Sequence, residues 1–313
     1  MIATPADVLG AVTEEVRALH DPADRDRLTF EHWVPRSERK QRQRLFVASV
    51  LDGTPRYVAK VALDPEDAMV GREWRILRAL HEGATTVPSP VAALERGFAM
   101  ASVGSRDLPD ALRDADPATW RRLLVRGAEI GARVHLSDER AVGDTTAPPT
   151  APLESGHDLP VETVEALARA RVGAVHGDMG PWNFRVADDG ALSLIDWEDY
   201  APRGICALDV LNLLLTASLI AYPEYRERGF DWLFGRLYDG DDPYHDAVRA
   251  ALSRYEEVTG EAPATVLALT PVFCGAMIRR IRAQGRPVDH LFFGPLAAYF
   301  ADRPLRRLGG AHV

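Results

Sequence analysis

Two short stretches of the sequence decide the fold: HGDMGPWN at residues 176–183 and LIDWED at residues 194–199. They supply Asp178, Asn183 and Asp196, which are two carboxylates and one amide. Moving a phosphoryl group from a nucleotide to a hydroxyl needs one carboxylate to orient the attacking oxygen. It also needs an amide oxygen and a second carboxylate to hold Mg²⁺ over the phosphates. The three residues match these needs together, whereas either stretch alone is weak evidence.

Short apolar segments around these stretches predict how the residues are placed. A strand is expected at residues 172–175 before the loop, a second at 184–186 after it, and a third at 192–195, with an Asp-Asp-Gly turn between the last two. Such a hairpin would bring Asn183 and Asp196 close enough for one cation to touch both. Asp and Asn are also ordinary turn residues, so a purely structural role for Asn183 stays open at this point.

The spacing H-x-D-x-x-x-x-N followed by a later Asp is that of a kinase catalytic loop. Through HGDMGPWN and IDWE, the sequence resembles the aminoglycoside phosphotransferase and choline kinase superfamily. The resemblance implies that Asp178 orients the acceptor hydroxyl and that Asn183 and Asp196 bind Mg²⁺. It implies structural support of the loop by His176. Asp209, in RGICALDVL, matches a downstream structural Asp of the superfamily, although a proline of that motif is missing here.

The same resemblance implies an α+β, two-lobed protein-kinase-like fold. We expect a small N-terminal nucleotide-binding lobe at residues 1–103, with an antiparallel β-sheet and one helix. A larger, mostly helical C-terminal lobe at residues 104–313 would carry catalysis and acceptor binding. The length of 313 residues allows two lobes, because one hydrophobic core rarely grows beyond about 250–300 residues. In the second lobe we predict a helix from Asp116 to about Ser137, followed by a flexible loop at residues 138–159.

Lysine usage gives an independent clue to nucleotide binding. The chain has two lysines, Lys40 and Lys60, and thirty-five arginines. Lys60 lies in an apolar strand, RYVAKVAL at residues 56–63, where a compact ammonium can approach phosphate oxygens in a tight space. On the following helix, Glu73 shares the apolar stripe of Leu77, and a buried carboxylate needs a partner. We therefore predict a Lys60–Glu73 ion pair, which positions the nucleotide phosphates in kinases; the alternative is that Glu73 reaches water at the edge of the stripe.

The helix that carries Glu73 has clear boundary signals. Asp64 is the expected N-cap, with Pro65 at the first helical position. Gly83 is expected to end the helix.

The segment before the first of the two paired strands departs from the kinase pattern. The strands, at residues 44–51 and 56–63, are predicted to be joined by an Asp52-Gly53 turn. The preceding stretch SERKQRQR, residues 37–44, has four positive charges and no glycine, whereas kinases cover the phosphates with a glycine-rich loop. Its cations either replace backbone amides over the phosphates or form a solvated turn, and both interpretations stay open.

Two further strands are predicted at residues 90–94 and 98–103, and Gly104 ends the second. In the superfamily that the motifs resemble, the connector after such a strand binds adenine through backbone groups. We therefore expect the nucleotide base to contact this connector: Met100, Ala101, Ser102 and Val103.

Composition limits the partners. The net charge of −9 argues against general binding of nucleic acid or an anionic membrane. Residues at the N-terminus show no basic region followed by an apolar core, so no secretion signal is expected. The most apolar stretch, residues 207–222, is too short to span a bilayer and contains Asp209 and Asn212. A cytoplasmic location is therefore expected. Cys206 and Cys274 lie in apolar patterns and are expected to be buried free thiols.

Other chemistries lack their motifs. The sequence has no G-x-x-x-x-G-K-[ST], no G-x-G-x-x-G and no C-x-x-C, which argues against a Walker ATPase, a dinucleotide oxidoreductase and a thiolate zinc site. We expect a Mg²⁺-dependent kinase that transfers the γ-phosphoryl of ATP or GTP to a hydroxyl of a small molecule. The alternatives are a kinase for Ser or Thr of a peptide and a nucleotide-binding regulator without turnover. An acidic run at residues 239–246, together with Glu198, Asp199, Glu224 and Glu227, could attract a cationic acceptor, although charge runs are usually solvated.

Overall fold

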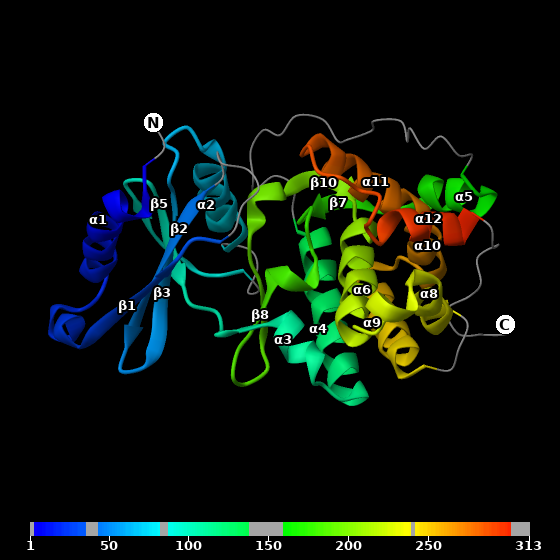
Figure 1. Ribbon diagram of the computed structural model, residues 1–313, viewed down its shortest axis with the longest axis horizontal. Helices are drawn as coiled ribbons and strands as arrows, with labels where there is room; N and C mark the ends of the chain where they lie inside the picture. The colour runs from blue at the N-terminus through cyan, green and yellow to red at the C-terminus, as the bar shows by residue number, and fades with distance from the viewer. Residues whose placement is uncertain (1–2, 36–42, 82–86, 138–158, 239–241, 302–313) are drawn as a thin grey trace. The chain divides into compact units, whose positions relative to one another are not determined.

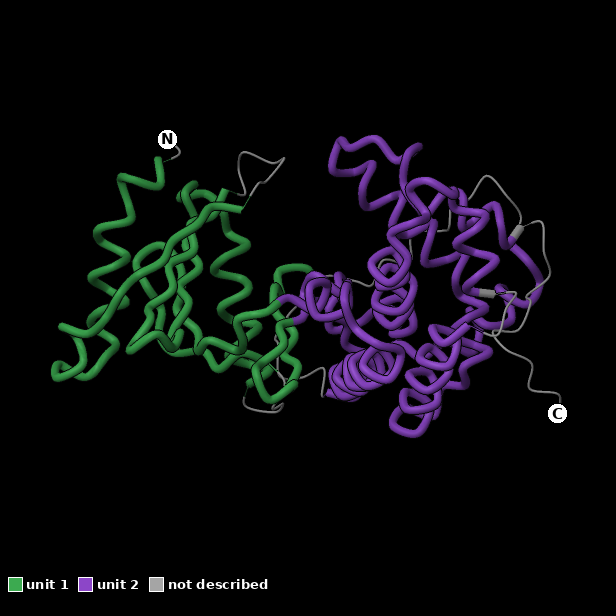
Figure 2. The backbone as a smooth tube through the Cα atoms, turned by 60° about the horizontal axis from the view of Figure 1, so that its bottom comes forward, with its two compact units in different colours: residues 1–106, 185–199 green, residues 107–184, 200–313 purple. Residues whose placement is uncertain are grey.

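The computed structural model describes residues 3–35, 43–81, 87–137, 159–238 and 242–301. Residues 138–158 of the predicted loop, residues 37–42 of the basic stretch and Gly83 lie outside this part of the chain. The chain forms two compact units, which Figure 2 shows in green and purple. Unit 1 contains residues 1–106 and 185–199, and unit 2 contains residues 107–184 and 200–313. Residues 185–199 are thus grouped with the N-terminal part of the chain, a grouping that the sequence did not predict.

A five-stranded antiparallel sheet forms the centre of unit 1 (Figure 1). In spatial order its strands are β1 (Leu28–Trp33), β2 (Arg44–Leu51), β3 (Thr54–Ala62), β5 (Gly97–Ala101) and β4 (Pro90–Leu94). The predicted turn between β2 and β3 is confirmed. Asp52 and Gly53 have φ angles of 51° and 79°, because a two-residue hairpin turn that follows the twist of the strands needs positive φ at both positions.

The two faces of this sheet pack against different helices. Helix α1 (Pro5–Ala18) covers one face, where its valines contact alternate residues of β2 and β3. Side chains alternate between the two faces along a strand, so Lys60 points to the opposite face. On that face Phe98, which pairs with Lys60 in the sheet, stacks on Trp74 of helix α2 (Ala68–His81). The sheet therefore separates an apolar side from the side that carries Lys60.

Helix α1 is an addition to the single helix predicted for this part of the chain. Thr4 caps it, Asp7 completes a capping box, and Val8, Val12 and Val16 form a buried stripe four residues apart. These signals are visible in the sequence.

The predicted start of α2 was wrong by one turn. The helix begins at Ala68, and the Asp67 carboxylate accepts a hydrogen bond from the Met69 amide. Asp64 instead closes a local turn by accepting from the Glu66 amide. Asp64 and Asp67 offer equivalent side-chain caps, and the sequence alone did not show which one lies closer to the helix.

The rest of unit 1 comes from residues 185–199. Strands β8 (Phe184–Val186) and β9 (Leu192–Leu194) are adjacent in a small sheet, as predicted, and Gly190 in their turn has a φ of 81°. The short 3₁₀ helix η5 (Trp197–Asp199) follows and packs on α2.

Unit 2 is mostly helical, and the predicted α+β class is confirmed. Its helices are α3 (Leu108–Arg113), α4 (Pro117–His135), α5 (Val161–Arg169), α6 (Ala207–Ala221), α7 (Tyr225–Arg228), α8 (Phe230–Tyr238), α9 (Pro243–Thr259), α10 (Pro263–Ala268), α11 (Thr270–Ala283) and α12 (Phe293–Ala301). Strand β7 (Val172–Val175) pairs with β10 (Ala201–Ile205), and β6 (Arg106–Asp107) lies where the chain passes from unit 1 to unit 2. Among the described helices, none combines the length and the apolar character needed to cross a membrane.

Candidate active site

Three charged side chains meet inside unit 1. Lys60 Nζ lies 2.5 Å from Glu73 Oε2 and 2.6 Å from Asp196 Oδ1. The Lys60 and Glu73 side chains are 4% and 2% exposed, whereas that of Asp196 is 37% exposed. The predicted Lys60–Glu73 ion pair is therefore confirmed, and the alternative of a solvated Glu73 is wrong. Their roles toward a nucleotide stay predictions.

Local structure fixes these three residues. Phe46 and Phe98 lie opposite Lys60 in the sheet register, and the ammonium sits 5.8 Å from the centre of the Phe46 ring. Asp196 has a φ of 63°, in the left-handed region that non-glycine residues seldom adopt. The next amide, of Trp197, donates to Glu73 Oε1 over 3.1 Å. This bond and the Lys60 contact hold the strained Asp196 backbone in place.

Burial and charge act against each other in this cluster. Burial opposes the charge on Lys60, but the carboxylates of Asp196 and Glu73 outweigh it and raise the pKa of the ammonium. Burial also raises the pKa of Glu73, and Lys60 only partly offsets this effect. Lys60 is thus held firmly as a cation, the state needed to bind phosphate oxygens.

A second ion-paired group lies beside the first. Arg44 donates to Asp67 over 3.1 Å and bonds to the Glu198 carboxylate, and Arg72 donates to the Glu198 carbonyl over 2.9 Å. Arg44 is the last positively charged residue of the basic stretch at residues 37–44, and the only one that the structure describes. Its side chain forms ion pairs inside unit 1. Glu198, one of the acidic residues expected to attract a cationic acceptor, is thus paired with Arg44, which it shares with Asp67.

Carboxylate oxygens of Glu73, Asp196 and Glu198 all lie within 4.8 Å of one another, a spacing at which acidic groups can hold a metal ion. Lys60 and Arg44 offset two of these three negative charges. Asp196 is the most exposed of the three, and hard carboxylate oxygens are the ligands that Mg²⁺ prefers. Asp196 therefore suits a metal better than its two neighbours.

The loop of the first sequence stretch lies in unit 2, where buried Asp209 holds it. The Asp209 carboxylate accepts from the amides of His176, over 2.6 Å, and Gly177, over 3.0 Å. His135 lies 3.3 Å from the same carboxylate and 2.9 Å from the Tyr255 hydroxyl. Burial works against ionisation of Asp209, but the hydrogen bonds from His135 and the His176 amide outweigh it and lower the pKa of the carboxyl. Asp209 thus serves as a charged anchor for the loop.

Further contacts shape the loop around Asp178. The His176 ring lies 3.3 Å from the Asp178 amide nitrogen, which agrees with the support role implied for His176. Asn183 Nδ2 donates to the Asp178 carbonyl over 2.7 Å, which leaves its Oδ1 as the atom suited to a cation. Met179 is fully buried, and a Cβ at Gly131 of α4 would lie 2.7 Å from its Cε, so a larger residue at position 131 would push the end of the Met179 side chain aside.

Two neighbours of the Asp178 carboxylate were missed by the sequence analysis. Arg280 Nη1, from α11, lies 3.2 Å from Asp178 Oδ1 and donates to the Gly177 carbonyl over 2.7 Å. Asn212 Nδ2, from α6, lies 3.4 Å from the same carboxylate oxygen. Asn212 stood out as a polar residue three positions after Asp209 in an apolar helix. No local pattern linked Arg280 to a loop about a hundred residues earlier.

The predicted base-binding connector lies at the end of β5. Met100 is buried, and the other members are half-buried. The amides of Ala101 and Ser102 donate to the carbonyls of Ser89 and Arg56. Among the described residues, the Val103 amide has no hydrogen-bond acceptor. It is therefore the amide of the connector best suited to donate to a nucleotide base.

The acidic run near α9 was expected to be a solvated loop or a cation attractor, and its described part is the start of a helix whose two aspartates pair with arginines. Asp242 is the N-cap of α9 and bonds to the Tyr222 hydroxyl and to Arg236. Asp246 pairs with Arg249. Residues 239–241 lie outside the described part. The two cysteines are buried free thiols, as predicted.

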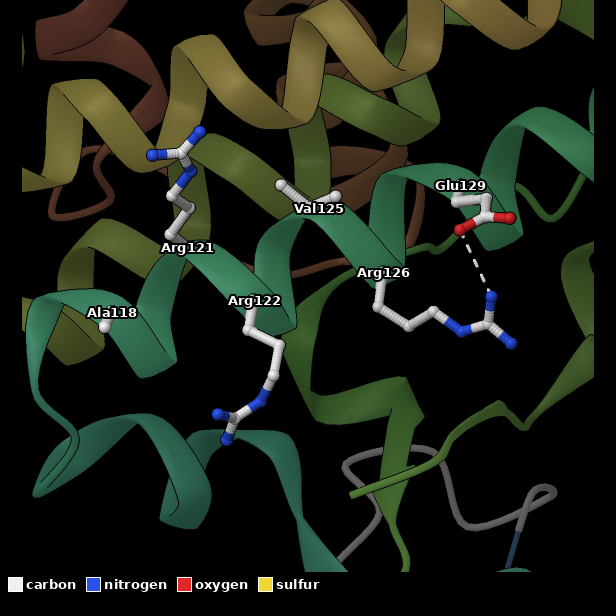
Figure 3. Close-up of a pocket in the computed structure, with 6 residues that line it drawn as sticks. All are labelled: Ala118, Arg121, Arg122, Val125, Arg126 and Glu129. Atoms are coloured by element: carbon white, nitrogen blue, oxygen red, sulfur yellow. Dashed lines mark hydrogen bonds and ion pairs between the residues drawn. The ribbon is translucent and has the colours of Figure 1, made fainter. Parts of the chain in front are cut away.

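A shallow pocket of about 420 Å³ on α4 contains none of the predicted site residues. It is lined by Ala118, Arg121, Arg122, Val125, Arg126 and Glu129. Figure 3 shows Arg126 bonded to Glu129, while Arg121 and Arg122 extend in different directions. The pocket is a surface feature of unit 2.

Comparisons with known proteins match the fold. No protein-family model and no curated protein sequence matches the chain. Among solved structures, the ethanolamine kinase of Plasmodium vivax aligns over 92% of this chain and 84% of its own, at 14% identity and a TM-score of 0.54. The streptomycin–ATP–APH(2")-IIa ternary complex aligns over 97% and 98%, at 14% identity and a TM-score of 0.53. The choline kinase LicA of Streptococcus pneumoniae aligns over 95% and 98%, at 14% identity and a TM-score of 0.52. The chain therefore has the protein-kinase-like fold of the aminoglycoside phosphotransferase and choline kinase superfamily.

Proposed function

We propose that the protein is a Mg²⁺-dependent phosphotransferase that moves the γ-phosphoryl of ATP, or of GTP, to a hydroxyl of a small molecule. The observation that carries the proposal is the buried Lys60–Glu73 pair with Asp196 beside it. A buried ion pair is weak evidence for stability, because desolvation can cancel its gain. A lysine kept charged beside one exposed carboxylate is suited to a phosphate chain and its metal.

In this proposal each residue has one task. Lys60 binds phosphate oxygens and Glu73 orients it. Asp196 and Asn183 supply the carboxylate and amide oxygens for Mg²⁺, which neutralises phosphate charge when it is bound. Asp178 accepts the proton of the acceptor hydroxyl as the new P–O bond forms and the bond to the nucleoside diphosphate breaks. The Val103 amide contacts the base.

The test is an acceptor screen with Mg²⁺ and either ATP or GTP. Nucleoside diphosphate formation would be measured with and without each acceptor, and the product identified by mass spectrometry. Transfer that is lost in Asp178→Ala is the expected result. Transfer only to peptides would favour the Ser/Thr alternative, and nucleotide binding with no turnover would favour a regulator.

A further inference from the structure

The carboxylate of the proposed base Asp178 has a cation beside it. Arg280 Nη1 lies 3.2 Å from Asp178 Oδ1, and the two side chains are 27% and 20% exposed. The pair is therefore partly open, and the bond to the Gly177 carbonyl fixes the guanidinium against the loop. Whatever hydroxyl compound reaches Asp178 meets this positive charge.

Simple geometry limits how far the acceptor is from Arg280. A hydroxyl that donates to Asp178 Oδ1 lies about 2.7–2.8 Å from that oxygen. Its oxygen is then within roughly 6 Å of Nη1, the sum of this length and the 3.2 Å separation. A substituent on the first or second carbon beyond the hydroxyl-bearing carbon can thus contact the guanidinium.

The stretch of chain that carries Arg280 has further positive charges. From Thr270 to Val288 the chain has four arginines, Arg279, Arg280, Arg282 and Arg286, and no acidic residue. This stretch lies in a protein whose net charge is −9. Charges in contact with a ligand, more than the net charge of the chain, select the charge of that ligand.

Basic residues at the end of a helix also have a plain structural reason, since they favour the negative end of the helix dipole. That reason applies equally to Arg282, which is exposed, and to Arg280. It does not explain why Arg280 lies against Asp178. Arg282 is therefore the matched control.

We propose that Arg280 selects an anionic acceptor: an alcohol with a phosphate or carboxylate group one or two carbons from the reacting hydroxyl. This inference rests on the proposed phosphotransferase function. The guanidinium binds the anion, Asp178 receives the hydroxyl proton, and an ammonium at the same position is repelled. Arg280 is a specificity-determining residue, whereas Asp178 remains the base.

The experiment compares matched acceptors that differ at one carbon. They are glycerol, 3-amino-1,2-propanediol, D-glycerate and glycerol 3-phosphate, with a second set of glucose, glucosamine, gluconate and glucose 6-phosphate. The full-length wild type, Arg280→Gln, Arg280→Lys and Arg282→Gln would be assayed with Mg²⁺ and ATP. Nucleotide turnover would be measured with and without acceptor, and Asp196→Asn would report contaminating activity.

The wild type is expected to use the phosphate or carboxylate members best. Losing a charged hydrogen bond should raise KM for those members about 10- to 100-fold in Arg280→Gln, with a smaller change in kcat. Arg280→Lys should keep part of the preference, and Arg282→Gln should match the wild type. The phosphate and carboxylate arms show which anion is preferred.

Three results would overturn the inference while leaving the proposed function intact. They are a preference for the cationic or neutral members, nucleotide turnover without transfer to any anionic member, and an equal rise in KM for all acceptors in Arg280→Gln. Absence of any turnover above the Asp196→Asn background would instead reject the proposed function, and the inference with it.

Discussion

The Lys60–Glu73 pair allows a quantitative test, because the two residues have different numbers of oppositely charged partners. Lys60 has two carboxylate partners, whereas Glu73 has one cation and the Trp197 amide. Lys60→Met leaves Glu73, with a side chain only 2% exposed, without its counter-charge. Removing one member of a buried ion pair costs about 3–5 kcal/mol. Glu73→Gln leaves Lys60 paired with Asp196, so its cost should be nearer that of one charged hydrogen bond, about 1.5–3 kcal/mol.

The double variant separates this account from its alternatives. With both charges removed, the loss in the free energy of unfolding should be smaller than the sum of the two single losses by a coupling energy of about 1–3 kcal/mol. Denaturant unfolding followed by circular dichroism, with Arg75→Gln on the exposed side of α2 as control, would measure it. Additivity within about 0.5 kcal/mol would refute the reasoning.

The same four proteins test the functional role. Each single variant should lower kcat/KM for the nucleotide, and the double variant should be little worse than either, since residues that act as a unit are non-additive. Lys60→Arg should also lose activity, because a planar guanidinium does not fit the place of a compact ammonium. Strictly additive kinetic losses would separate the ion pair from nucleotide use.

Three more outcomes are expected. Asp178→Ala should lower transfer by about 10²- to 10⁴-fold while nucleotide binding is kept; more than a tenth of wild-type turnover would contradict the assignment. Asp196→Asn should weaken the Mg²⁺ dependence of nucleotide binding in calorimetry, and an unchanged dependence would reject the metal role. Hydrogen bonds from Arg133, Arg254 and Arg126 lower the pKa of Glu129 to about 2. A carboxyl with a depressed folded-state pKa stabilises above its unfolded pKa and loses that stability as pH falls toward the folded value. Glu129→Gln should thus cost about 1–3 kcal/mol at pH 7, and the gap to wild type should close between about pH 4.5 and 2 in denaturant titrations.

Elements with strong local signals could be predicted from the sequence. Strands β2 and β7 have the predicted bounds, and α4 begins where Asp116 and Pro117 predicted, with Asp116 accepting from the Thr119 amide. The Lys60–Glu73 pair was predictable because a buried charge needs a partner and few candidates existed. In each case a short stretch of chain determines the outcome.

The remaining contacts depend on residues far apart in the chain. Asp209 receives two loop amides from 32 and 33 positions earlier, and Arg280 lies 103 positions from the carbonyl it contacts. Neither partner is fixed by hydrophobic period, capping or turn chemistry. Helix α1 is a different case, because its cap and valine stripe were present in the sequence and were overlooked.

The charge of the acceptor illustrates why composition is a poor guide to a site. The acidic run near α9 predicted attraction of a cation, but Asp242 is used to cap its helix and to bind Arg236, and Asp246 pairs with Arg249. Paired charges contribute little field beyond a few ångströms, because their opposite signs cancel and salt screens the remainder. At Asp178 the nearest charge is the guanidinium of Arg280, at 3.2 Å. An acceptor bound at Asp178 meets this guanidinium at contact distance, so the acceptor should follow this local charge and not the net charge of the chain.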